Sequence, residues 1–209
     1  MNLLVLENST SVGSLAWVEN GRVVREETHE SPRGRGAQWF ENLANFAGRP
    51  IDGILIGTGP GSYNGLRSAA AAAWGLARAR NVPLRGVSSL LGYPDENYAV
   101  VGDARAGQWF FAAVRDRHFQ TSPLLIPAGR GLPDGAGVLY CVNKESAPSG
   151  ALLRHPSAGL LARFWEVAGT PEPIYLKPPH ITMPARPPAR LASPAPADGP
   201  GGRPEEAGS

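Results

Sequence analysis

Short apolar runs separated by turn residues open the chain. Residues 3–6 form the first run, and residues 12–18 form a second run that mixes apolar and polar side chains. The pair Asn20-Gly21 follows, which is a preferred turn between two antiparallel strands, and residues 23–24 are again apolar. The pattern therefore predicts a three-stranded antiparallel meander.

The next apolar positions recur at helical spacing. Trp39, Leu43 and Phe46 lie three and four residues apart, and Gly48 and Pro50 end the segment. This spacing predicts one helix.

A strand and a long helix are predicted after it. The strand starts at residue 51, and the alanine-rich helix covers residues 64–80. Asn64 is the expected N-cap, and Asn81 and Pro83 are expected to stop the helix.

The second half of the chain repeats part of this order. Residues 99–103 and 108–114 predict two strands joined by an acidic loop, and residues 115–117 predict a turn, as in residues 3–18. Hairpins are common, so coincidence is the alternative to an internal duplication.

The remaining segments are less regular. Prolines and glycines in residues 126–137 are typical of a loop, and Cys141 lies in an apolar run that predicts a buried strand. A helix is expected over residues 157–168 with Ser157 as its N-cap. Residues 172–177 alternate as in a short, ordered strand.

A glycine-rich turn at residues 57–67 connects the predicted strand that starts at residue 51 to the predicted alanine-rich helix. Its glycines and proline let the backbone turn sharply, and the helix points its positive dipole end at the turn. Such an end suits an anion or a closely packed second protein. A Walker A loop is excluded because lysine occurs only at Lys144 and Lys177. The glycine spacing does not fit the dinucleotide fingerprint, and Ser62 is not framed as in a nucleophile elbow.

Three sequence segments within residues 59–90 carry a family resemblance. They are Gly59-Pro60-Gly61-Ser62-Tyr63-Asn64-Gly65-Leu66-Arg67, Gly75-Leu76-Ala77 and Val82-Pro83-Leu84-Arg85-Gly86-Val87-Ser88-Ser89-Leu90, with weaker similarity at residues 4–10, 103–107 and 172–177. The chain resembles the TsaB family, the smaller actin-like partner in bacterial tRNA threonylcarbamoyladenosine synthesis. The resemblance implies an α/β, actin-like fold, a duplicated ribonuclease H-like unit with mixed sheets, here with a reduced second lobe.

This fold divides the chain into three expected parts. Residues 1–92 are the N-terminal actin-like lobe, and residues 93–183 are the reduced C-terminal lobe. Residues 184–209 are rich in proline, alanine and glycine and lack the large apolar side chains that offset the entropy of ordering. We expect a disordered tail whose removal leaves fold and association intact.

The resemblance also indicates where a nucleotide would bind. In nucleotide-hydrolysing relatives of the actin fold, an acidic residue after the first strand of each lobe flanks Mg²⁺ and the phosphates. Glu7 and Asp103 hold these positions here, with Thr10 in the first loop. Glu7 is one methylene longer than the usual aspartate, which disturbs the octahedral geometry that Mg²⁺ demands. We therefore expect no cofactor and no catalytic residue, and Mg²⁺–ATP binding is the alternative.

The histidines do not predict a metal site. His29, His118, His155 and His180 are far apart in the sequence, and no two form the i, i+4 pair that binds a metal on one helix face. The catalytic paralogue of the TsaB family carries such a pair. Metal-dependent hydrolysis is therefore not expected.

The alanine-rich helix is the predicted partner interface. Its candidate residues are mostly small or apolar and recur at steps of three and four: Asn64, Leu66, Arg67, Ala70, Ala73, Trp74 and Ala77. The alternative is that this face packs on the chain's own sheet. In the TsaB family this helix and the preceding one pair with a catalytic TsaD-like paralogue or with a second copy. We therefore expect a TsaD-like partner, and a homodimer when the chain is alone.

Composition narrows the function further. The 209 residues carry a net charge of only +2, which lacks the electrostatic footprint of a stand-alone tRNA binder, so tRNA contact is expected to be indirect. Neither a charged leader nor an apolar run of spanning length occurs, which predicts a cytoplasmic protein without membrane contact. The sequence thus predicts a non-catalytic subunit that binds and organises the threonylcarbamoyl transferase. An ATP-binding phosphotransferase of the same fold and a divergent homodimeric interaction protein are the alternatives.

Overall fold

In the computed structural model, the described residues are 1–30, 37–120, 122–133, 137–144 and 147–177. They belong to one compact unit, Met1–Lys177. Within these residues, no helix combines the length and the apolar character needed to cross a bilayer. The tail predicted for residues 184–209 lies outside the described residues.

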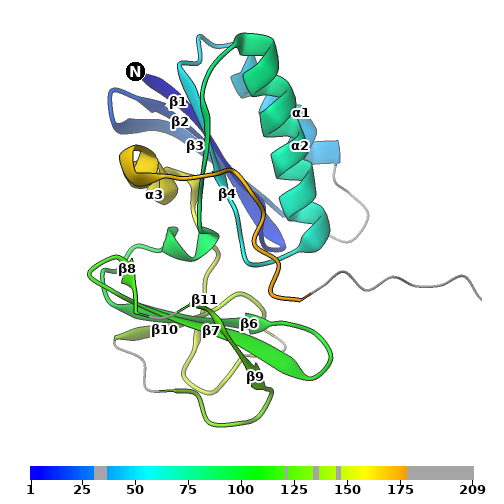
Figure 1. Ribbon diagram of the computed structural model, residues 1–209, viewed down its shortest axis with the longest axis vertical. Coiled ribbons are helices and arrows are strands. Elements are labelled where there is room, and N and C mark those ends of the chain that lie inside the picture. Colours follow the sequence, from blue (N-terminus) through cyan, green and yellow to red (C-terminus); the bar gives the residue numbers. More distant parts are fainter. Residues whose placement is uncertain (31–36, 121, 134–136, 145–146, 178–209) are drawn as a thin grey trace, which may run out of the picture. The chain divides into compact units, whose positions relative to one another are not determined.

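A five-stranded sheet comes from the first part of the chain, in the strand order β3-β2-β1-β4-β5 (Figure 1). Its strands are β1 (Asn2–Glu7), β2 (Val12–Glu19), β3 (Arg22–Glu30), β4 (Gly53–Gly57) and β5 (Leu84–Val87). The first three are antiparallel neighbours, and β4 and β5 continue the sheet in parallel with β1. The predicted meander is confirmed, and Asn20 and Gly21 form its turn with φ values of 50° and 77°.

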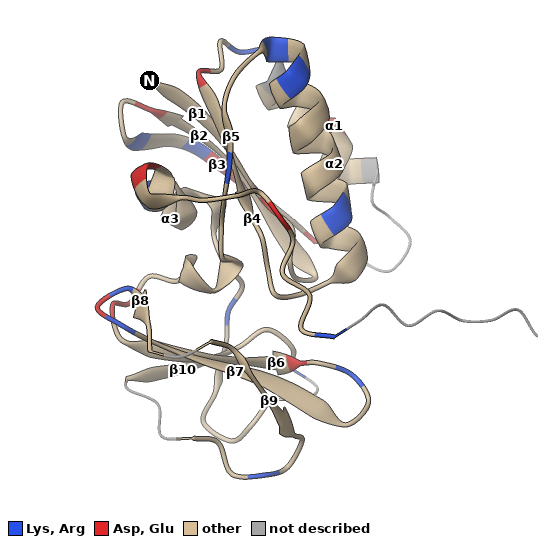
Figure 2. Ribbon diagram, in the orientation of Figure 1, with Lys and Arg blue, Asp and Glu red and all other residues tan. Residues whose placement is uncertain are grey.

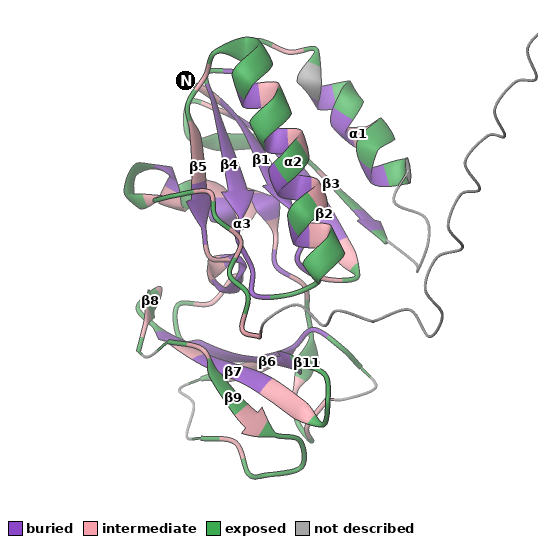
Figure 3. Ribbon diagram, turned by 45° about the vertical axis from the view of Figure 1, so that its right-hand side comes forward, coloured by how far each residue is buried: buried purple, intermediate pink, exposed green. Residues whose placement is uncertain are grey.

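Helices cover both faces of this sheet. They are α1 (Ala37–Ala47), α2 (Tyr63–Arg80), α3 (Ala158–Leu161) and the 3-10 helices η1 (Ser89–Leu91) and η2 (Ala162–Val167). Neighbouring residues of β1 serve opposite cores, because Leu4 packs with α1 and α2 whereas Val5 packs with α3 and η2. Figure 3 shows β1 and β4 buried among these helices. Burial on both faces explains why residues 3–6 and 54–56 are continuous apolar runs rather than alternating ones.

A second sheet repeats the strand order of the first, as β8-β7-β6-β10-β11. Its strands are β6 (Tyr98–Asp103), β7 (Gln108–Arg115), β8 (His118–Phe119), β9 (Leu124–Pro127), β10 (Val138–Cys141) and β11 (Leu152–Leu153). Here too the first three strands, β6, β7 and β8, are antiparallel neighbours. Strands β10 and β11 continue the sheet in parallel with β6. The internal duplication is therefore confirmed, and coincidence is excluded.

We call the segment from β1 to β5 the first unit and the segment from β6 to β11 the second unit. The second unit lacks counterparts of the large helices α1 and α2. In the first unit α1 lies between β3 and β4, and α2 lies between β4 and β5. The corresponding connections in the second unit hold the short strand β9 and irregular chain, with no helix among the described residues between β8 and β11. The loop predicted for residues 126–137 is wrong at its start, because Ile126 and Pro127 pair with β7.

Two smaller predictions also need correction. The N-cap of α2 is Ser62 rather than Asn64, since the Ser62 hydroxyl accepts the Gly65 N–H at 3.3 Å and Asn64 already lies in the first turn. Residues 172–177 form no strand. The Ile174 N–H donates to the carbonyl of Thr58, the residue after β4, at 2.7 Å.

Side chains of β2 and β3 form hydrogen bonds with the start of α3. The buried Ser14 hydroxyl accepts the Ala158 N–H at 2.8 Å. Glu26 accepts both the Ser157 hydroxyl at 2.7 Å and the Gly159 N–H at 3.1 Å. Ser157 is also the N-cap, as predicted. Amides that a helix start leaves without partners are thus satisfied from the sheet.

Replacing Ser14 with alanine should therefore destabilise the fold. The change leaves the buried Ala158 amide without an acceptor, which costs about 1–3 kcal/mol. Urea unfolding followed by circular dichroism measures the loss. Ser11→Ala, at an exposed position in the preceding loop, is the control and should stay close to wild type. Equal stabilities of the two variants would contradict the role of Ser14.

Candidate functional site

The glycine-rich turn after β4 is filled by the chain's own hydrogen bonds. The Gly59 N–H donates to the Ser89 hydroxyl oxygen at 2.9 Å. The Ser62 N–H donates to the Ser9 carbonyl at 2.6 Å. These amides already have acceptors within the protein, so they are not offered to an external anion.

The loop between β1 and β2 covers the start of α2. A Cβ added at Gly61 would lie 2.1 Å from the Ser9 carbonyl oxygen, and one added at Gly65 would lie 2.0 Å from the Asn8 carbonyl oxygen. Only glycine permits so close an approach of two backbones. The positive end of α2 therefore faces carbonyl oxygens of its own chain, at the place where the sequence predicted an anion or a second protein.

Glu7 ends β1 with its side chain fully buried. Its Oε1 accepts the Ser9 N–H at 2.6 Å, and its Oε2 has no hydrogen-bond partner among the described residues. A Cβ added at Gly57 would lie 1.7 Å from Oε2, so the carboxyl group rests against the backbone of β4. Burial raises the pKa of Glu7, and the nearby hydroxyls of Ser89 and Ser9 offset this only in part.

Thr10 and Asp103 are engaged in separate places. Thr10 Oγ1 donates to the Val12 carbonyl at 2.7 Å and lies 2.9 Å from Nδ1 of His155. Asp103 is exposed at the end of β6, where its Oδ1 accepts the Arg105 N–H at 2.7 Å. Each residue thus stabilises its own loop.

The predicted nucleotide residues do not fit a Mg²⁺ site. The Glu7 carboxyl group faces the interior, Asp103 caps an exposed turn, and Thr10 closes the loop after β1. Mg²⁺ needs several oxygen ligands that converge at about 2.0–2.1 Å. Across the described part of the chain, histidine, cysteine and acidic side chains also form no group of three or more that could hold a metal ion.

The predicted interface on α2 is wrong for four of its seven residues. Ala70, Ala73 and Ala77 are buried between α2 and the first sheet, and Leu66 is buried next to Gly59 of the glycine-rich turn. The alternative stated for this face, packing on the chain's own sheet, is therefore correct for the three alanines. Alanines surround the helix, so the apolar pattern could not separate its inner face from its outer face.

The other three predicted interface residues are exposed. Trp74 has 57% of its surface accessible. Arg67 lies over the Tyr63 ring and donates to its hydroxyl at 3.0 Å, and Asn64 is exposed beside them. Between Arg67 and Arg78, α2 carries no charged residue (Figure 2).

An apolar groove of about 460 Å³ runs between α1 and α2. Its lining residues are all apolar: Phe40, Leu43, Ala44, Ala71, Ala72, Gly75, Leu76 and Ala79. Phe40 is 48% exposed, whereas Phe46, Phe110 and Phe111 are buried. The sequence prediction missed this groove. The available signal was that Phe40 and Ala44 are apolar although they lie beside the core-facing stripe of Trp39, Leu43 and Phe46 rather than within it.

Two sheets of the same strand order, the first with helices on both faces, define the actin-like class of α/β fold that the sequence predicted. Known proteins support this class and the family resemblance. The family model of TsaD, the tRNA N6-adenosine threonylcarbamoyltransferase, matches residues 38–112.

Two solved structures from Pseudomonas aeruginosa are similar to the chain. YeaZ has a TM-score of 0.65 at 24% sequence identity, over 84% of this chain and 99% of that one. An uncharacterized protein with similarity to peptidase YeaZ has a TM-score of 0.65 at 23% identity, with the same coverage of 84% and 99%. Curated proteins gave no match to the sequence. The resemblance to a TsaB-like protein is thus confirmed at the level of the fold shared with YeaZ, and residues 38–112 match the TsaD family model.

The contact between Gly57 and Glu7 predicts non-additive mutations. Gly57→Ala should destabilise the fold by about 1–3 kcal/mol, because its methyl group overlaps the buried Glu7 carboxyl group. The penalty should be smaller in a Glu7→Ala background, where that group is gone. A double-mutant cycle in urea measures the coupling. Gly131→Ala, where an added Cβ meets nothing within 4 Å, is the control. Purely additive effects would contradict the contact.

The raised pKa of Glu7 predicts a pH-dependent difference from Glu7→Gln. The folded chain retains the proton at pH values where the unfolded chain has lost it, so wild-type stability falls as pH rises above the ordinary glutamate value of 4.5. Glu7→Gln lacks this contribution. The free energy of unfolding of Glu7→Gln minus that of wild type should therefore grow with pH, by at most about 1.4 kcal/mol per pH unit, and level off above the folded pKa.

Unfolding by urea at a series of pH values measures this difference. Contributions of the other ionisable groups are common to both proteins and cancel in the comparison. A difference that stays constant from acid to neutral pH would show that Glu7 titrates normally.

Proposed function

We propose that this chain is a non-catalytic subunit that binds and organises a threonylcarbamoyl transferase in tRNA modification. The observation that carries the proposal is the exposed apolar groove between α1 and α2. The groove lies within residues 38–112, the segment matched by the transferase family model. A transferase of that family is therefore expected to present a related pair of helices.

The groove has the properties of a helix-packing surface. Ala71, Gly75 and Ala79 follow one another at steps of four along α2 and are exposed. Such small side chains let another helix approach closely, and the larger Phe40 and Trp74 offer apolar area beside them. Two chains with the same helix pair can dock face to face, with each pair filling the groove of the other. The same surface supports a homodimer when the transferase is absent.

The first loops of the fold support a role without catalysis. The glycine-rich turn, the loop after β1 and the Glu7 carboxyl group pack closely against one another. An ATP-using phosphotransferase needs amides and carboxylates that face the nucleotide. The small net charge of +2 likewise favours tRNA contact through the partner rather than through this chain alone.

A charge placed in the groove should abolish association. Ala44→Arg buries an unpaired guanidinium in the interface, which costs about 3–5 kcal/mol and weakens binding by about two to four orders of magnitude. Asn45→Arg, at the adjacent exposed residue of α1 that does not line the groove, is the matched control and should bind normally. Calorimetry with the TsaD-like transferase of the same organism measures both variants, and light scattering reports the homodimer.

Several outcomes would contradict the proposal. Equal binding by both variants would remove the groove as the interface, and absence of any complex with the transferase would remove the partner. Micromolar Mg²⁺–ATP binding with turnover by the isolated chain would favour the phosphotransferase. Retention of the homodimer without transferase binding would favour an unrelated partner. Circular dichroism checks the fold, and Ala73→Glu, a change in the core, is the reference for a destabilised variant.

A further inference from the structure

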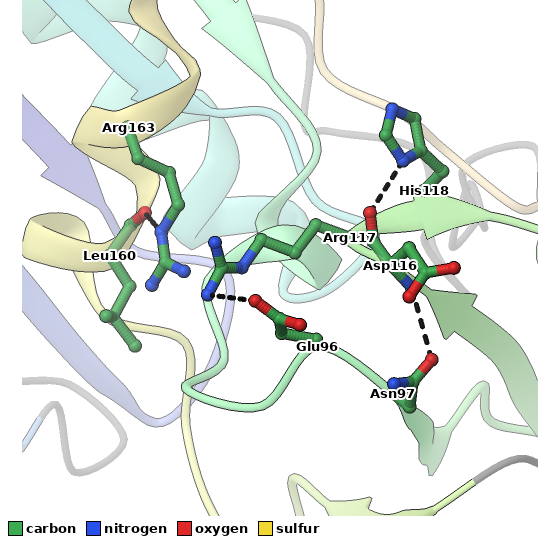
Figure 4. A network of polar contacts seen from close by, with 7 residues as sticks. All are labelled: Glu96, Asn97, Asp116, Arg117, His118, Leu160 and Arg163. Carbon is green, nitrogen blue, oxygen red and sulfur yellow. Dashed lines mark hydrogen bonds and ion pairs between the residues drawn. The ribbon is translucent and has the colours of Figure 1, made fainter.

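Two arginine side chains from distant parts of the sequence converge at one point. Arg117 lies in the turn between β7 and β8, and Arg163 lies in η2. Figure 4 shows their guanidinium groups side by side, with the Glu96 carboxylate next to Arg117. The Asp116 carboxylate lies on the other side of the turn. Two cations are thus held together with one neighbouring anion.

Arg117 is fixed at its backbone and at its side chain. Its N–H donates to the Glu96 carbonyl at 3.1 Å, and the Asp116 N–H donates to Oδ1 of Asn97 at 3.2 Å. The guanidinium lies 3.1 Å from the Glu96 carboxylate. Its Nε is shielded from solvent and donates to no acceptor in the described chain.

The backbone of this turn does not favour an arginine. Asp116 and Arg117 have φ values of 49° and 62°, in the left-handed region where glycine is preferred at the second position. A side chain there is strained.

Arg163 is fixed in the same direction. Its Nε donates to the Leu160 carbonyl at 2.8 Å, which leaves the terminal NH₂ groups directed at Arg117. Partial burial lowers the pKa of Arg163, the nearby positive charge of Arg117 lowers it further, and Tyr98 and Glu96 oppose this shift. A bound anion would add to the effect of Glu96 and favour both charged guanidinium groups.

We propose that Arg117 and Arg163 form a binding site for a phosphate group. One carboxylate, from Glu96, faces two guanidinium groups, so the cluster keeps a positive charge. Each guanidinium presents N–H donors in a planar fork that matches two oxygens of a phosphate. A tetrahedral anion with several oxygens can accept from both forks at once, which a single planar carboxylate does less well. The phosphate belongs either to a free ion or small molecule or to a polynucleotide backbone.

This site is independent of the proposed function. Its residues come from β7–β8 and η2, and none of them lines the groove between α1 and α2. The transferase can therefore bind while the phosphate site is vacant, and the two proposals can fail separately.

Two arginines with similar positive φ values provide a matched pair of glycine substitutions. Arg117→Gly removes the guanidinium and places glycine where φ is 62°, so the turn should be at least as stable as before. Arg105→Gly is the matched control, because Arg105 is also an exposed arginine in a turn, with φ of 64°, between β6 and β7. Both variants lose one positive charge. Arg163→Gln tests the second guanidinium.

Binding is measured at constant ionic strength with two probes. Inorganic phosphate is followed by calorimetry, and a short single-stranded RNA is followed by fluorescence anisotropy. We expect saturable phosphate binding that is at least about tenfold weaker in Arg117→Gly and Arg163→Gln but close to wild type in Arg105→Gly. RNA binding with the same pattern would assign the phosphate to a polynucleotide, and RNA binding that is absent or unaffected by Arg117→Gly would assign it to a free ion or small molecule.

Two results would overturn the proposal. One is that wild type binds neither probe saturably. The other is that Arg117→Gly and Arg105→Gly weaken binding of both probes equally, because the effect would then follow net charge rather than the paired guanidinium groups.

Discussion

The contact between the loop after β1 and the glycines around the start of α2 governs much of this structure. At Gly61 and Gly65 two backbones approach more closely than any side chain would allow, and the carbonyl groups of Asn8 and Ser9 occupy the space in front of the helix. In the same region the Glu7 carboxyl group rests on Gly57. The glycine-rich sequence therefore packs chain against chain, where a similar sequence in other proteins cradles a phosphate.

The duplicated strand order and the placement of the helices determine which apolar surfaces are covered and which stay exposed. Two units share one strand order, but the large helices belong to the first unit. One face of the first sheet is covered by α1 and α2, and the opposite face is covered by α3 and η2. What remains is the outer groove between α1 and α2, which no described residue of the chain covers. A surface for association thus results from completing the core rather than from any single motif.

Local patterns predicted the elements well, because strands, turns and caps depend on neighbouring residues. Asn20-Gly21 and Ser157 are examples, and Asn64 failed as an N-cap only because Ser62 competes two residues earlier. The sites were harder to predict. Ala70 and Ala73 face the chain's own sheet, which an alanine-rich helix does not reveal, and the burial of Glu7 depends on a glycine fifty residues away. Arg117 and Arg163 meet only through the fold, so no spacing in the sequence connects them.

The position of α3 and η2 in the chain has a consequence for protein synthesis. These helices come after the whole second sheet in sequence, yet they cover Leu3, Val5 and Leu55 of the first sheet. Chains emerge from the ribosome starting at the N-terminus. The apolar face formed by these residues therefore stays uncovered until the segment 158–167 has left the ribosome. The sheet that is made first is completed last, and it is exposed to aggregation or to chaperones throughout that interval.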